Sequence, residues 1–382
     1  MDLHNRNRYT NDGPAAAEAR IERDQAIVAE AVRRALPGGE LVALVLAGGY
    51  GRGEGGYRVC DGDYLPYNDY DYFVVVNGRR PAERQIARQL GTVAHELEER
   101  VGVEVDFALL RASRLPRLEF TLMYAELQHG HRITCGRDDA LSGMRPMPIE
   151  RIPLAEFTRL MLNRGSLLLM NQRQLAAGGP KSGDELEQFS RYLDKALLAC
   201  ADARLAAAGR YDPSYAVKRR RLDDLRWSGS RDFLRRYDRA LAARAGDRWP
   251  LLAAEAAAAQ DLVVADWLES LAELETSRLG QLPDWDRYSS ARIGKGQSAA
   301  GALGVMRNLA VTMRDFGPGE LMRNATWALR YPRERLISVL PALLRPDLGV
   351  PCSAIAEALS QPQDLDRGML ADRFLGYWAR YN

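Results

Sequence analysis

The amino-acid sequence predicts an α+β protein, in which a mixed sheet with flanking helices is followed by an all-helical domain. The first observation is a series of short apolar runs in the first 140 residues or so, each bounded by glycine, proline or polar residues, as buried strands are. The second is that β-branched clusters become scarce after Pro148, where long periodic stretches rich in Ala and Leu begin. A length of 382 residues agrees with two or three domains.

The first domain is expected to span residues 15–148, after a flexible arm at residues 1–14. Its first element is an amphipathic helix from Ala15 to Leu36, which the following proline and glycines end. A second helix is predicted over residues 81–100, because proline stands in its first turn. The predicted strands lie at residues 41–47, 70–76, 103–110 and, after a turn, within 126–136.

The second domain is expected to span residues 149–382 and to be entirely helical. Periodic apolar positions predict helices at residues 154–177, 184–208, 232–245, 251–276 and 301–316. Glycine and proline clusters near residues 178–180 and 282–284 mark loops, and a sub-boundary is expected near residues 280–300.

The composition favours a cytoplasmic protein. Apolar residues make up 46% of the chain and charged residues 27%, as is usual for globular proteins. The four cysteines form no CxxC pair, which predicts reduced thiols and no zinc site. No apolar run approaches the ~18 residues of a membrane span. The net charge of +2 argues neither for nor against nucleic acid, but the sequence shows no basic, aromatic-rich groove that would predict such a partner. The basic run from Lys218 to Arg221 is predicted to be a solvated face.

Acidic residues on two predicted strands form a candidate metal site. Asp69 and Asp71 are two residues apart at the start of a strand, so the pleat places both carboxylates on one face. Like charges side by side are unfavourable unless a cation neutralises them. Asp106 lies in another predicted strand, and Glu104 shares its face. Such an oxygen-rich set suits Mg²⁺, which binds carboxylates together with substrate phosphates.

A glycine-rich turn follows the first predicted strand. Gly48 and Gly49 end that strand, and residues 50–55 are expected to lead into a short helix. Backbone without Cβ atoms can approach a phosphate closely, and Arg52 adds a positive charge in the same turn. Glu54 is expected to support this loop or to hold Arg52. Together with the carboxylates, the turn predicts phosphoryl or nucleotidyl transfer.

The order of these motifs resembles the DNA polymerase β nucleotidyltransferase superfamily. The run from Gly48 to Glu54 is similar to that of bacterial PII uridylyltransferases, and HGHRITCG (129–136) is similar to the strand that closes the minimal domain of antibiotic nucleotidyltransferases. The resemblance covers residues 40–136. It implies that the double glycine binds triphosphate, that the paired aspartates bind two Mg²⁺ ions, and that the third carboxylate helps to activate an acceptor hydroxyl.

These patterns give two sets of candidate residues. The predicted catalytic and metal-binding residues are Asp69, Asp71 and Asp106, with two Mg²⁺ ions for which Mn²⁺ can substitute. The predicted nucleotide- and phosphate-binding residues are Gly48, Gly49, Tyr50, Arg52 and Lys195. Lys195 lies mid-helix in an apolar pattern of the helical domain, where related enzymes often have a triphosphate-binding lysine; the alternative is a surface lysine with a buried stem.

The expected activity is Mg²⁺-dependent transfer of a nucleoside monophosphate from an NTP, with ATP favoured, to a hydroxyl of a small molecule or protein, by a monomer or homodimer. One alternative is a synthase of cyclic or linear signalling oligonucleotides, and another is a non-catalytic, nucleotide-binding, antitoxin-like module. Nineteen residues separate Gly49 from Asp69, more than is usual in the superfamily. The excess is assigned to a tyrosine-rich loop at Gly56–Pro66, either a cover for the site or a surface insertion.

Overall fold

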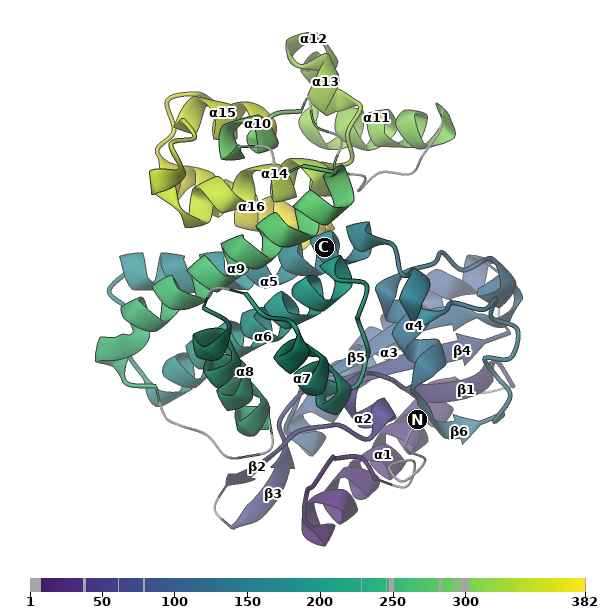
Figure 1. Ribbon diagram of the computed structural model, residues 1–382. Helices are drawn as coiled ribbons and strands as arrows, with labels where there is room; N and C mark the ends of the chain where they lie inside the picture. The colour runs from purple at the N-terminus through teal and green to yellow at the C-terminus, as the bar shows by residue number, and fades with distance from the viewer. Residues whose placement is uncertain are drawn as a thin grey trace. The chain divides into compact units, whose positions relative to one another are not determined.

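The computed structural model describes residues 8–36, 39–60, 62–77, 80–227, 229–244, 246, 251–281, 284–291, 293, 295 and 302–381. The chain is a mixed α/β structure with one small mixed sheet and mostly helical content, in agreement with the predicted α+β class (Figure 1). It divides into two compact units. The first comprises Met1–Pro153, Asp212–Asp224 and Asp238–Trp249, and the second comprises Leu154–Tyr211, Leu225–Tyr237 and Pro250–Asn382.

This division differs from contiguous domains at 15–148 and 149–382, because two later segments return to the first unit. Part of the predicted arm is also attached to that unit: the backbone N–H groups of Tyr9 and Thr10 donate to the carboxylate of Glu18, and Gly55 N donates to Tyr9 O. Residues 1–7 lie outside the described part of the chain, as do several residues of the predicted sub-boundary near 280–300.

The first unit is built on a four-stranded mixed sheet with the order β5-β4-β1-β6. β4 runs parallel to β5, and β1 runs antiparallel to both β4 and β6. All four strands overlap the predicted ranges: β1 (Leu41–Leu46), β4 (Tyr70–Val76), β5 (Val105–Arg111) and β6 (Arg132–Gly136).

Helices α1 (Ala15–Ala35) and α3 (Arg80–Val101) cover one face of this sheet and form its core with alternate strand residues (Figure 1). In β4 these are the even-numbered residues, including Tyr70 and Tyr72, which are almost fully buried. Their hydroxyls donate to side chains of α1, at 3.0 Å and 2.7 Å. Because side chains alternate along a strand, this packing turns Asp71 to the opposite face.

The predicted loop at Gly56–Pro66 is a β-hairpin, a difference from the sequence prediction. β2 (Tyr57–Cys60) pairs antiparallel with β3 (Asp63–Pro66), and residue 61 lies outside the described ranges. The rings of Tyr57 and Tyr64 contact each other across the two strands, with centroids 6.0 Å apart. Cross-strand aromatic pairs stabilise hairpins, which accounts for strands in so polar a segment.

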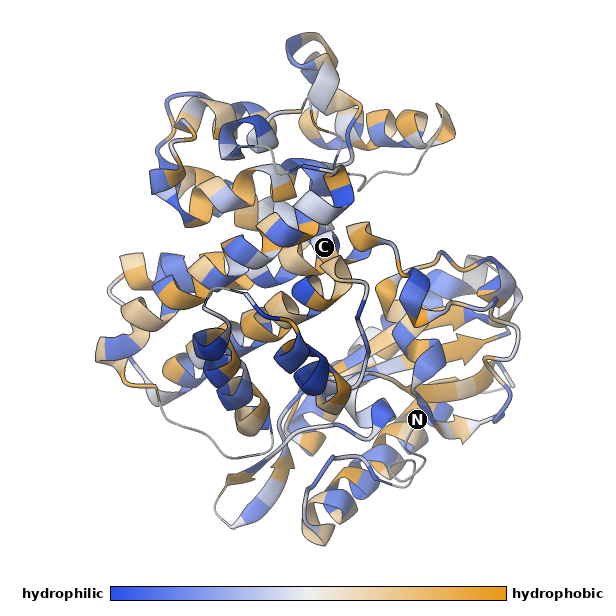
Figure 2. Cartoon of the chain, in the orientation of Figure 1, coloured by the Kyte–Doolittle hydropathy of each residue, from blue (hydrophilic) through white to orange (hydrophobic). Residues whose placement is uncertain are grey.

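Shorter helices complete the first unit: η2 (Ala112–Arg117), α4 (Leu122–His129), η3 (Ile149–Arg151) and α7 (Tyr215–Asp224), with the last part of α8 (Ser230–Arg244). Figure 2 shows α7 mostly in hydrophilic colours. The prediction that its basic run is a solvated face is wrong for Lys218, of which only 2% is exposed. Arg219 and Arg221 form ion pairs with acidic residues of the same unit.

The second unit is a helical assembly around α5 (Leu154–Ala176), α6 (Gly183–Ala207) and α9 (Ala256–Leu279), which pack on one another. The buried ring of Trp267 donates to Met161 O at 3.0 Å, and a Cβ at Gly165 would lie 2.5 Å from that ring. Glycine at this position therefore lets α5 and α9 approach closely. The other elements of this unit are η4 (Ala253–Glu255), α10 (Trp285–Ser289), α11 (Ala302–Phe316), α12 (Gly319–Arg323), α13 (Ala325–Ala328), α14 (Pro332–Leu344), η5 (Pro346–Leu348), α15 (Cys352–Leu359) and α16 (Arg367–Tyr381).

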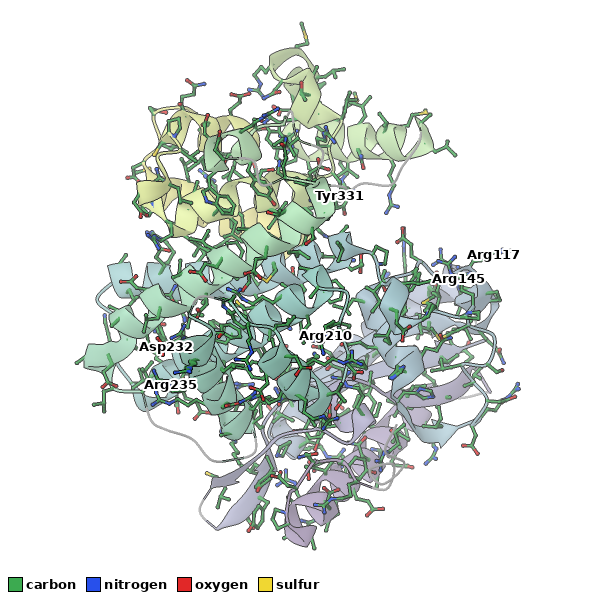
Figure 3. The ribbon with its side chains drawn as sticks, in the orientation of Figure 1. Arg117, Arg145, Arg210, Asp232, Arg235 and Tyr331 are labelled. Atoms are coloured by element: carbon green, nitrogen blue, oxygen red, sulfur yellow. The ribbon has the colours of Figure 1, made fainter. Side chains whose placement is uncertain are left out.

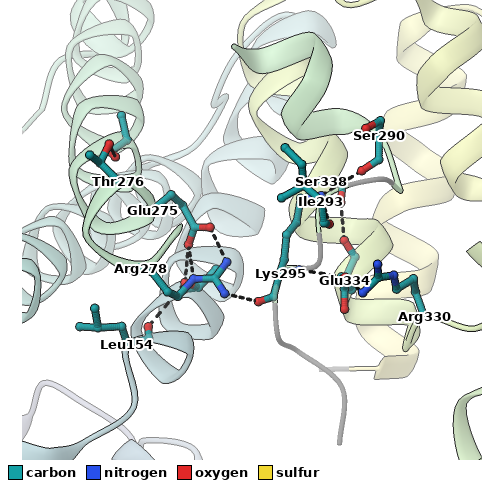
Figure 4. A network of polar contacts seen from close by, with 12 residues as sticks. Leu154, Glu275, Thr276, Arg278, Ser290, Ile293, Lys295, Arg330, Glu334 and Ser338 are labelled. Carbon is teal, nitrogen blue, oxygen red and sulfur yellow. Dashed lines mark hydrogen bonds and ion pairs between the residues drawn. The ribbon is translucent and has the colours of Figure 1, made fainter. Parts of the chain in front are cut away.

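A buried polar network joins several helices of the second unit (Figure 4). The ammonium group of Lys295 donates to two backbone carbonyls, and its backbone N–H donates to Glu334 Oε1 at 2.9 Å. Arg278 donates to Lys295 O at 2.6 Å and to Glu275. Burial lowers the pKa of Lys295 to about 7, against the opposing effect of the two carboxylates.

The abundant arginines are often paired along helices, as Asp232 and Arg235 are on the surface of α8 (Figure 3). Such exposed pairs contribute little to stability, typically ~0–1 kcal/mol. None of the helices in the described part of the chain is long and apolar enough to cross a membrane.

Candidate functional site

The glycine turn lies at the end of β1. Gly48 and Gly49 open the short helix α2 (Gly48–Arg52), and Gly48 adopts a φ of +61°, which other residues rarely take. A Cβ at Gly48 would lie 2.7 Å from Oδ2 of Asp71. The backbone of Asp71 also accepts a hydrogen bond from Ala47 N at 2.8 Å. The turn therefore directly contacts the strand that carries the paired aspartates.

The second glycine lies next to a positively charged group, whereas the first lies next to the Asp71 carboxylate. A Cβ at Gly49 would lie 2.9 Å from Nη2 of Arg244 and 3.2 Å from the carbonyl oxygen of Glu54. The two adjacent glycines thus have a carboxylate beside one and a guanidinium beside the other. Gly51 has a packing role, since its Cβ would lie 2.4 Å from Leu46 O.

The candidate aspartates occupy neighbouring backbone positions. Asp71 of β4 pairs in register with Asp106 of β5, and both are exposed. Strands in a sheet lie ~4.8 Å apart, and paired residues of parallel strands share a face. Asp69 stands one residue before β4 and is half-buried. Tyr70 N donates to Glu104 O, so the register continued by one residue brings Glu104 beside Asp69.

The donor chemistry of these residues fits Mg²⁺, which prefers carboxylate oxygens. However, no group of three or more histidine, cysteine or acidic side chains in the described residues is placed to hold a metal ion. The register brings the aspartates next to one another on two strands, but it does not gather their side chains around one point. A metal-bound form would therefore require these side chains to move.

Tyr50 is buried behind the turn, with 2% of its surface exposed. Its hydroxyl donates to Gly56 O at 2.6 Å and accepts from Tyr67 N at 3.0 Å and Asn68 N at 3.3 Å. Burial raises the pKa of Tyr50, so the hydroxyl keeps its proton. Because the side chain is buried behind the turn, only the backbone of Tyr50 could make the predicted contact with phosphate.

Arg52 already has two acidic partners. It forms ion pairs with Glu126 at 3.2 Å and Glu54 at 3.9 Å, and the carbons of its side chain pack against Gly130. The expectation that Glu54 holds Arg52 is therefore met. The guanidinium of Arg52, which the sequence predicts to face the phosphates, pairs with these carboxylates. This pairing indicates that Arg52 links α2 to α4.

Sequence reasoning missed three residues that approach the turn from the later chain. Glu54 accepts hydrogen bonds from Ser214 Oγ at 2.7 Å and Tyr215 N at 3.3 Å. The guanidinium of Arg244 lies over the Tyr215 ring, 4.6 Å from its centroid. The guanidinium of Arg244 also donates to Glu54 O at 3.4 Å. The contacts of Glu54 with these later residues span 160 to 190 positions in the sequence, and no local motif marks them.

Lys195 lies on α6 of the second unit and is half-buried. Its predicted contact with triphosphate stays a prediction. The second unit also contains a cavity of about 560 Å³, lined by Arg204, Trp227 and Glu273 among others, and none of the predicted site residues contributes to it.

No protein-family model matches this chain, and no curated protein matches it either. The class that the fold and site define is an α+β protein with a glycine turn against two strand-borne aspartates. What the protein does must be inferred from these residues.

Proposed function

We propose that the chain is a cytoplasmic nucleotidyltransferase of the polymerase β type, which transfers a nucleoside monophosphate from an NTP to a hydroxyl of a small molecule or protein. The observation that carries this proposal is the contact of Gly48 with the carboxylate of Asp71, which itself lies in register with Asp106. A bare backbone next to acidic residues on adjacent strands suits a nucleotide whose phosphates are bound together with a metal ion.

Each residue has a distinct task in this reaction. Gly48 and Gly49 admit the triphosphate close to the backbone, and Asp69, Asp71 and Asp106 would hold Mg²⁺ or Mn²⁺. Bound there, the metal would polarise the α-phosphate and neutralise the triphosphate charge. Asp106 accepts the proton of the acceptor hydroxyl. A bond forms between the acceptor oxygen and the α-phosphorus, and the bond to the β-phosphate oxygen breaks, releasing pyrophosphate.

The test is Mg²⁺-dependent pyrophosphate release by the Asp69→Ala and Asp71→Ala variants. Loss of a metal-binding carboxylate is expected to lower turnover by about a hundredfold or more, without loss of the fold. Asp139→Ala is the matched control, because Asp139 is an exposed residue of the same unit that pairs with Arg137. Unchanged turnover in a folded Asp69 or Asp71 variant would rule out the assignment. Oligonucleotide products formed from NTPs without an acceptor would instead favour a signalling synthase.

A further inference from the structure

The first unit contains a positively charged group that no sequence motif indicates, the guanidinium of Arg244. It ends α8 and reaches the glycine turn, where its Nη2 atom would lie 2.9 Å from a Cβ at Gly49. Any side chain at Gly49 would displace it. The second glycine is therefore bordered by an arginine of the same unit.

Contacts on several sides fix this arginine. The Tyr215 ring supports the guanidinium, 4.6 Å from its centroid, as cation–π pairs do. Tyr215 is in turn held by the carboxylate of Glu54, which accepts a hydrogen bond from its backbone N–H. The carbonyl oxygen of Arg244 packs so closely on Gly56 that a Cβ there would lie 2.3 Å away. The guanidinium is thus held in place before any ligand arrives, which lowers the entropy cost of binding.

Arg244 has no direct carboxylate partner in the part of the chain that the structure describes, and its one hydrogen bond there is a long contact of 3.4 Å with Glu54 O. Arg52, in the glycine turn itself, has two carboxylate partners. A half-buried positive charge favours binding of an anion.

The charged groups beside the two glycines of the turn differ in sign. Gly48 borders the Asp71 carboxylate, whereas Gly49 borders Arg244. A metal-bound polyphosphate presents cationic metal to one side and free phosphate oxygens to the other. Guanidinium groups bind such oxygens in a bidentate manner. We propose that Arg244, supported by Tyr215 beside Gly49, is the residue that binds the β- and γ-phosphates of the nucleotide. The identification of the ligand as a nucleotide rests on the proposed function, whereas the assignment of a polyphosphate-binding site does not.

The experiment measures binding by titration calorimetry of the full chain and its Arg244→Ala variant. The probes are inorganic tripolyphosphate and the four NTPs with Mg²⁺, and nucleoside monophosphates serve as ligands without terminal phosphates. Arg244→Ala is expected to weaken tripolyphosphate and NTP binding by roughly 10- to 100-fold, as for a lost charge-assisted pair, and to leave monophosphate binding unchanged. Arg137→Ala is the control, an exposed arginine of the same unit paired with Asp139.

A second variant keeps the test valid if Arg244→Ala unfolds. Gly49→Ala leaves the arginine in place but forces Nη2 away, and it is expected to weaken the same two probes. If wild type binds NTPs and neither variant weakens that binding, the role of Arg244 is refuted and nucleotidyl transfer stands. If wild type binds tripolyphosphate through Arg244 but binds no NTP, the anion site is supported and nucleotidyl transfer is refuted. Binding of neither probe by wild type would refute both.

Discussion

Tyr50→Phe removes one hydroxyl behind the glycine turn and is expected to loosen the chain just before Asp69. The hydroxyl accepts hydrogen bonds from Tyr67 N and Asn68 N and donates to Gly56 O. Tyr67 N and Gly56 O also bond each other, at 3.1 Å, so this pair survives the substitution. Asn68 N loses the phenolic acceptor, and Asn68 is the residue that precedes Asp69.

The magnitude follows from these contacts. A buried donor left without its acceptor costs ~1–3 kcal/mol, and the aromatic ring, which is retained, preserves the packing. A reduction of about 2 kcal/mol in the free energy of local opening corresponds to roughly 30-fold faster amide exchange. Hydrogen-exchange mass spectrometry of peptides covering residues 64–70 measures this change directly.

The same substitution is expected to reduce pyrophosphate release by about tenfold or more, because small displacements of catalytic groups lower turnover strongly. Tyr64→Phe is the matched control: within the described residues the Tyr64 hydroxyl makes no hydrogen bond, so neither exchange nor turnover is expected to change. Identical exchange in wild type and Tyr50→Phe would show that the hydroxyl does not hold this segment.

Two further predictions concern a backbone position and a buried charge. Gly48→Ala is expected to abolish Mg²⁺-dependent pyrophosphate release, because its Cβ displaces Asp71. Gly102→Ala is the control: Gly102 has a φ of +78° and no neighbour within 4 Å of a Cβ, so this variant carries only the backbone cost of ~1–2 kcal/mol. Equal activity of the two variants would contradict this prediction. The pKa of Lys295 is lowered by burial from 10.5 to about 7, so between these values the unfolded chain binds a proton that the folded chain does not, and stability rises with pH. Thermal melting at pH 7 and pH 9.5 is expected to show a smaller rise for Lys295→Met than for wild type, and equal rises would exclude this lysine as the cause.

The fold of the first unit follows largely from local patterns. The strand at residues 70–76 has the predicted bounds, because β-branched and aromatic residues fill both faces of a central strand. The helices at Ala15–Ala35 and Leu154–Ala176 end within one residue of their predicted limits, where apolar periodicity stops. The hairpin at residues 57–66 could not be predicted in this way, because its stability depends on pairing between its strands rather than on an apolar run.

The candidate site was only partly predictable for a related reason. Neighbouring positions for Asp71 and Asp106 follow from two strands whose buried faces are evident in the sequence. The ion pairs that occupy Arg52, and the approach of Arg244 to Gly49, depend on tertiary contacts. Side chains brought together over nearly 200 residues leave no periodic or motif signal, so single-sequence reasoning could not find them.

The interrupted course of the chain through the first unit has a consequence for biosynthesis. The sheet and its two covering helices are complete once residue 136 has been made, but α7 and segment 238–249 follow only after α5 and α6. A ribosome adds ~5–20 residues per second, so the sheet waits for several seconds before Arg244 leaves the exit tunnel. During that time the nascent chain holds its aspartates and glycine turn without the arginine, and a fragment ending at residue 153 would stay in this state permanently.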